Sequence, residues 1–141
     1  METLATRSRR WTRLDYARML DCGLLREGDR VELVGGHLIV REPQRTPHAT
    51  ATRLVTRALE TVFAVAFDVR AGLPLALDPE SEPEPDVAVV RGGPRDYLED
   101  HPSRPVLVVE VAQSSLAFAT GAGPLRTPGR TSARAGRPRW A

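Results

Sequence analysis

Val106-Leu107-Val108-Val109-Glu110-Val111 is the most strand-like stretch of this sequence. Apolar residues fill both alternating sets of positions, which is typical of a strand buried from both sides. One charge, Glu110, interrupts the run. A carboxylate in such a strand is costly unless a metal ion or an arginine compensates it. The stretch therefore predicts a core strand that carries a chemically significant acid.

A second acid lies at the start of the preceding predicted strand. Asp86 follows Pro85 directly and leads into Val87-Ala88-Val89-Val90. Neighbouring strands commonly pair, so Asp86 and Glu110 are expected to lie close together. Two carboxylates can jointly hold Mg²⁺, and such an ion can stabilise phosphodiester charge and activate a water. The alternative is a turn aspartate beside a core glutamate that is paired with an arginine.

The remaining pattern alternates helices and strands. Thr12 and Asp15 have the spacing of a helix start, with Leu14, Ala17, Leu20 and Leu24 at helical spacing and Gly28 beyond the end. Two apolar runs around Gly35-Gly36 predict a tight hairpin. A long amphipathic helix is predicted from the spacing of Ala51, Leu54, Val55, Ala58, Leu59 and Val62, and short β-like runs follow at 65–69 and 73–77.

These motifs resemble a known family. Pro85-Asp86 followed by Glu110 looks like the PD-(D/E)XK nuclease core, in a version similar to the Uma2 family of restriction-endonuclease-like proteins. Residues 30–38 (RVELVGGHL) resemble that family's "RYELVDGEL" hairpin. Thr46-Pro47-His48 resembles its "SPRH" helix entry, and residues 109–115 (VEVAQSS) resemble its "VEVxxxS" strand end. The resemblance runs from about Trp11 to Phe118, in the right order.

The resemblance implies a fold, a metal and a substrate. The fold is α/β (α+β), a restriction-endonuclease-like mixed sheet flanked by helices and incomplete at the C-terminus. Mg²⁺ or Mn²⁺ would bind at Asp86 and Glu110, with Glu32 and His48 as active-site neighbours. DNA would be the partner, and a homodimer is left open. Without the resemblance, Glu32 would be interpreted as an exposed hairpin residue and His48 as a hydrogen-bonding residue at a helix start.

The chain departs from the nuclease signature at its lysine. All 20 basic Lys or Arg residues are arginine, and Ala112 occupies the position two residues after Glu110. In the Uma2 family the lysine looks displaced to the next helix, where this chain instead has a Gly/Pro/Arg-rich tail over residues 119–141. We therefore expect a domain over residues 11–118, a disordered tail, and weak or absent activity. A frameshift near residue 118 is one hypothesis for the tail, and genuine divergence is the alternative.

Composition narrows the class of protein further. A chain of 141 residues is long enough for one domain, and its apolar runs are too short to cross a membrane. No apolar stretch follows the basic start, so a cytoplasmic protein is expected. Residues 111–141 hold 5 arginines and no acid, a charge that could hold DNA or could simply be solvated. Two other functions remain open: a module that binds DNA without cutting it, and a remnant without function.

Overall fold

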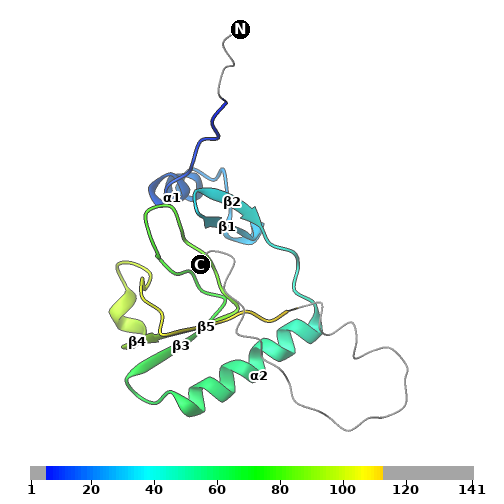
Figure 1. The fold of residues 1–141 in the computed structure, drawn as a ribbon, viewed down its shortest axis with the longest axis vertical. Helices are drawn as coiled ribbons and strands as arrows, with labels where there is room; N and C mark the ends of the chain where they lie inside the picture. Colours follow the sequence, from blue (N-terminus) through cyan, green and yellow to red (C-terminus); the bar gives the residue numbers. More distant parts are fainter. Residues whose placement is uncertain (1–5, 113–141) are drawn as a thin grey trace, which may run out of the picture.

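The computed structural model describes residues 6–112, and the elements follow each other along the chain as in Figure 1. Two α-helices, α1 (Arg13–Asp21) and α2 (Thr46–Val62), accompany five strands and two short 3₁₀ helices. The strands are β1 (Val31–Val34), β2 (His37–Val40), β3 (Phe67–Ala71), β4 (Val87–Arg91) and β5 (Leu107–Val109). The 3₁₀ helices are η1 (Glu27–Asp29) and η2 (Pro94–Tyr97). No helix within this range has the length and apolar character that a membrane crossing needs.

Helix α1 begins where the sequence predicts. The Thr12 side chain accepts a hydrogen bond from the Asp15 backbone, and the Asp15 side chain bonds back to the Thr12 backbone. This capping box satisfies backbone donors that the first turn would otherwise leave free. The predicted apolar face is wrong in part, because Leu14 and Leu24 are exposed while Tyr16 and Met19 are buried. Helix α1 ends at Asp21, so Leu24 lies beyond it and cannot extend that face.

The predicted hairpin is confirmed with the register centred on its two glycines. Strands β1 and β2 pair antiparallel, with Val34 opposite His37. Gly35 and Gly36 have φ of 55° and 79°, the left-handed values that such a tight turn requires. The hairpin is also tied to the loop before β4, since Glu82 N–H donates to the Leu33 carbonyl at 2.7 Å.

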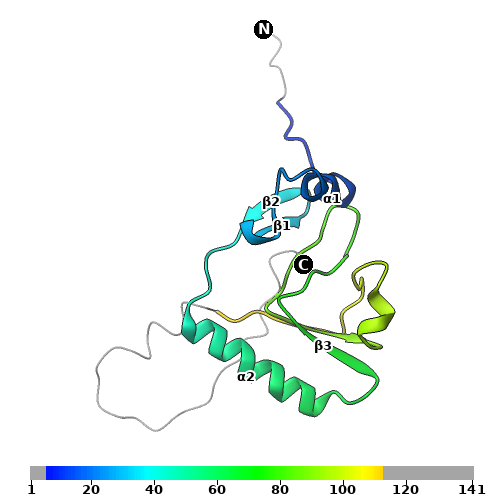
Figure 2. The same ribbon diagram turned by 180° about the vertical axis from the view of Figure 1, so that it is seen from behind.

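A three-stranded antiparallel sheet forms the centre of the described chain. Strand β4 lies between β3 and β5, and its residues Val87–Val90 are buried. The core cluster consists of Leu75, Ala88 and Val90, with Leu77, Tyr97 and Val108 packed around it. Helix α2 runs alongside β3 and contacts both β3 and β4, as the two opposite views show (Figures 1 and 2). Helices and sheets thus make an α+β fold, as predicted, although every pairing between described strands is antiparallel.

Two strand predictions are corrected. Residues 73–77 form no strand, because their N–H groups bond to irregular partners such as the Pro83 and Pro102 carbonyls. The predicted strand at 106–111 is not buried on both faces: Val106, just before β5, is 43% exposed, and Leu107, the first residue of β5, is 36% exposed. Within residues 6–112 β5 pairs only with β4, which leaves its other side without a neighbouring described strand. The predicted tail, residues 119–141, and the end of the predicted domain at 118 lie outside the described residues.

Candidate functional site

Asp86 is the centre of the candidate site. It ends the loop between β3 and β4, and only 3% of its surface is exposed. Its Oδ2 accepts a hydrogen bond from the Val111 N–H at 2.7 Å, and its Oδ1 lies 3.4 Å from Nη2 of Arg41. Both oxygens therefore accept from N–H donors, as expected of an ionised carboxylate. These donors compensate a charge that burial alone would make costly.

His48 reaches Asp86 from the first turn of α2. Its Nε2 lies 3.1 Å from Asp86 Oδ2, and the residue is 4% exposed. Because a carboxylate can only accept, Nε2 carries the proton and donates it to this bond. The other ring nitrogen, Nδ1, is buried and has no hydrogen-bond partner in the described part of the chain. His48 thus holds the Asp86 carboxylate in place, a stronger role than the helix-start hydrogen bond that the residues alone suggested.

Glu110 lies next to Asp86, as the strand prediction required. Val109 of β5 is opposite Val87 of β4, so Asp86 and Glu110 are the adjoining residues just beyond that pair. Partial burial raises the pKa of Glu110 to about 7, and the negative charge of Asp86 and a hydrogen bond with it add to the shift. Solvent still reaches the Glu110 residue. The two carboxylates are therefore close enough for each to oppose the charge of the other.

Glu32 is buried on β1, and only 7% of it is exposed. Its Oε2 accepts a hydrogen bond from the Glu84 N–H at 2.9 Å. The negative charge of Glu32 also raises the pKa of Glu110 and of Glu84. The structure thus brings Glu32 toward the Asp86–Glu110 pair, and the view of it as an exposed hairpin residue is wrong.

The residues around Asp86, here called the Asp86 cluster, are Asp86, Glu110, Glu32, His48, Arg41 and Glu84. The sequence-based prediction does not include two of them. Arg41, just after β2, places its Nη1 3.7 Å from Oε2 of Glu84 while Nη2 faces Asp86. Burial raises the pKa of Glu84, and Arg41 opposes that shift. The alternation of Glu82, Glu84 and Asp86 could have indicated Glu84, since such positions share a face. Arg41 has no comparable signal, because its contact with Asp86 spans 45 residues.

Two adjoining carboxyl groups are the oxygen donors that could contact a hard divalent cation. Asp86 and Glu110 adjoin each other, Glu32 acts on the pKa of Glu110 and of Glu84 through its charge, and Arg41 and the His48 ring contact Asp86. Mg²⁺ prefers oxygen ligands and is commonly bound by one or two carboxylates that leave room for waters and phosphates. Within residues 6–112 no three His, Cys, Asp or Glu side chains converge as a complete metal site. Asp86 and Glu110 would therefore have to share a cation with water.

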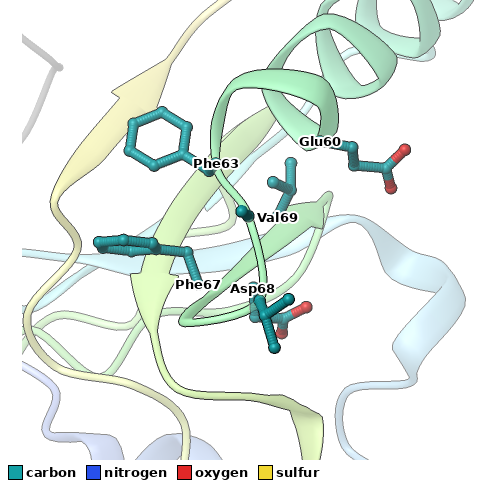
Figure 3. Close-up of a pocket in the computed structure, with 7 residues that line it drawn as sticks. Glu60, Phe63, Phe67, Asp68 and Val69 are labelled. Carbon is teal, nitrogen blue, oxygen red and sulfur yellow. The ribbon is translucent and has the colours of Figure 1, made fainter.

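A hollow at the other end of α2 lies apart from this cluster. It measures about 410 Å³ and lies between the end of α2 and β3, beside Glu60, Phe63, Phe67, Asp68 and Val69 (Figure 3). Glu60 is 12 residues after His48, which corresponds to about 18 Å along a helix. None of the predicted site residues lines it. The hollow is therefore separate from the candidate site.

The described chain is thus an α+β protein with two neighbouring carboxylates at the ends of paired strands. Residues 14–123 match the Uma2 family, which is described as "Putative restriction endonuclease". This match covers well over half of the sequence, and the chain belongs to the Uma2 family. No curated protein matches the sequence.

Proposed function

We propose that this chain is a nuclease of low activity that hydrolyses DNA phosphodiester bonds with Mg²⁺ or Mn²⁺. The observation that carries the proposal is the adjacency of Asp86 and Glu110 just beyond the paired residues Val87 and Val109. Membership of a family described as "Putative restriction endonuclease" supports the choice of DNA as substrate. When bound, the cation would polarise a phosphate oxygen and make a water more acidic.

The residues of the chain would divide the remaining tasks. Asp86 and Glu110 would hold the cation through their carboxylate oxygens. His48 donates to Asp86 Oδ2 and Val111 N–H donates to the same atom, so the orientation of this carboxylate is fixed before substrate arrives. Glu32 is held in turn by the Glu84 N–H. Such preorganisation lowers the cost of arranging charge during the reaction.

Two features support a low rate. The chain contains no lysine, and loss of one preorganised electrostatic group typically costs about a hundredfold or more in rate. Arg41 also faces Asp86 Oδ1 at 3.4 Å, where its positive charge competes with an incoming cation. Both effects reduce activity without changing the fold.

Cleavage of supercoiled plasmid tests the proposal. Wild-type protein should nick DNA slowly in Mg²⁺ or Mn²⁺ and not in EDTA, and Asp86→Asn and Glu110→Gln should abolish nicking. Asp68→Asn is the matched control, because Asp68 is a carboxylate on β3 outside the cluster. Calorimetric titration with Mn²⁺ gives a readout besides activity, and Asp86→Asn should remove the binding. Undiminished nicking by folded Asp86→Asn protein, or a complete lack of metal binding by wild type, would refute the proposal.

A second function is favoured by one specific observation. Arg41 and His48 already compensate Asp86, so the site can be stable without a cation. A protein of this kind could bind DNA without cutting it. Salt-sensitive DNA binding that Asp86→Asn leaves unchanged, together with no nicking in either metal, would select this second function.

A further inference from the structure

A basic groove runs along α2 beside the candidate site. It has a volume of about 490 Å³. The residues that line it are Gln44, Ala49, Thr52, Arg53, Thr56, Arg57, Glu60 and Ala71. Arg53 and Arg57 are four residues apart on the helix, so they lie on the same face about one turn apart. Both are exposed.

The groove begins next to the Asp86 cluster. Ala49 follows His48 in the chain, and His48 bonds to Asp86. Ala71, which also lines the groove, precedes Gly72, whose N–H donates to the Asp86 carbonyl at 3.0 Å. One end of the groove therefore lies near the Asp86 backbone, and its lining residues on α2 extend from Ala49 to Glu60.

The charges of the groove are available to a ligand. Among residues 6–112 neither Arg53 nor Arg57 forms a salt bridge, although Glu60 is three residues beyond Arg57. Thr52 Oγ1 is buried beside the groove and has no hydrogen-bond partner among residues 6–112, which is unusual for a shielded hydroxyl. An anion with several oxygens could accept hydrogen bonds from the exposed guanidinium groups of Arg53 and Arg57.

We propose that this groove binds the phosphate backbone of duplex DNA and directs it to the Asp86 cluster. Arginine guanidinium groups are well suited to phosphate oxygens, and a row of them contacts successive parts of a strand without reading its sequence. The single carboxylate of the lining, Glu60, lies at the end away from His48, so the side nearer the cluster is the more basic one. This inference rests on the proposed function for the identity of the nucleic acid.

The test is DNA binding by the full chain in EDTA, where cleavage does not occur. The probe is a short fluorescently labelled duplex, and anisotropy gives the affinity over a range of salt concentrations. Arg53→Gln combined with Arg57→Gln removes the two charges. The matched control is Arg18→Gln combined with Arg95→Gln, which removes two exposed arginines from α1 and η2.

The groove variant should bind roughly tens of fold more weakly at about 0.1 M salt, and its salt slope should fall by about 2. The control should bind within about twofold of wild type, on the scale expected for charges without phosphate contacts. Equal affinity and slope for the groove variant and the control would overturn the groove proposal, as would no DNA binding by wild type. If the groove variant binds DNA more weakly but wild type does not nick DNA in Mg²⁺ or Mn²⁺, the groove proposal is supported and the proposed hydrolysis is refuted. Nicking that depends on Asp86 but not on Arg53 and Arg57 would support the proposed hydrolysis and overturn the proposal that the groove binds DNA.

Discussion

At the scale of single residues, Asp86 shows how several weak contacts fix one carboxylate. It receives an N–H from Val111, a ring N–H from His48 and the charge of Arg41, which come from three different parts of the chain. Partial burial raises the pKa of Glu110 to about 7, and the negative charge of Asp86 beside it adds to the shift. The two neighbouring acids thus differ in their contacts, since Asp86 is held by three donors while Glu110 faces the negative charge of Asp86.

The raised pKa of Glu110 predicts a pH dependence of stability in metal-free protein. An unfolded glutamate has a pKa near 4.5 and the folded one about 7, so the folded state binds this proton more tightly. The contribution to stability is present below pH 4.5 and is lost as pH rises through about 7. We therefore compare the free energies of unfolding of Glu110→Gln and wild type, measured with urea in EDTA. The difference in favour of Glu110→Gln should be larger at about pH 8 than at about pH 5.

Glu99→Gln is the control for that measurement, since Glu99 is exposed and lies outside the cluster. It should unfold with the pH dependence of wild type. A Glu110→Gln variant that follows the same pH profile as wild type would contradict the assignment of the titration to Glu110.

At the scale of elements, local interactions explain where α1 begins and where the β1–β2 hairpin turns. The capping box at Thr12 starts α1, and the two glycines at positive φ reverse the chain between β1 and β2. Gly36 has a further constraint that Gly35 lacks. A Cβ at Gly36 would lie 2.7 Å from Cβ and 3.2 Å from Cα of Arg10, whereas a Cβ at Gly35 would meet nothing within 4 Å.

This difference predicts unequal effects of substitution in the turn. Gly36→Ala combines a left-handed backbone cost of about 1–2 kcal/mol with a contact against the Arg10 backbone. Gly35→Asn should cost well under that, because asparagine tolerates the left-handed region. Urea unfolding should place Gly36→Ala at the lower midpoint. Equal urea midpoints for the two variants would contradict this prediction, because they would mean that the backbone around Arg10 moves away at little cost in free energy.

At the scale of the whole molecule, stability depends on the small core around β4. Leu75 is fully buried against Ala88 and Val90, although it comes from an irregular segment and not from a strand. Helix α2 contributes fewer buried side chains to the core than its apolar pattern suggests, because Leu54 and Val62 are 63% and 74% exposed. Apolar character alone therefore overestimates which residues form the core.

Replacing leucines at the two kinds of position tests this view of the core. Leu75→Ala should destabilise the protein by about 2–5 kcal/mol, since it removes buried methyl groups and leaves a cavity. Leu54→Ala should stay within about 0.5 kcal/mol, the range of ordinary surface changes. Thermal and urea unfolding monitored by circular dichroism would measure both. If Leu54→Ala lowered the free energy of unfolding as much as Leu75→Ala, Leu54 would have to be covered by another surface.

The sequence by itself determined the features that depend on near neighbours. These are the helix start at Thr12, the hairpin register at Gly35-Gly36, the long helix α2 and the adjacency of Asp86 and Glu110 through pairing of successive strands. Each follows from local dihedral preferences, from side-chain periodicity or from the tendency of consecutive strands to pair.

Only the tertiary structure decided which groups share the site. It buried Glu32, placed His48 and Arg41 on Asp86, and left β5 partly exposed. These outcomes depend on packing between segments tens of residues apart, which no local pattern encodes. The physical reason is that desolvation and charge pairing are set by everything around a group and not by its neighbours in sequence alone.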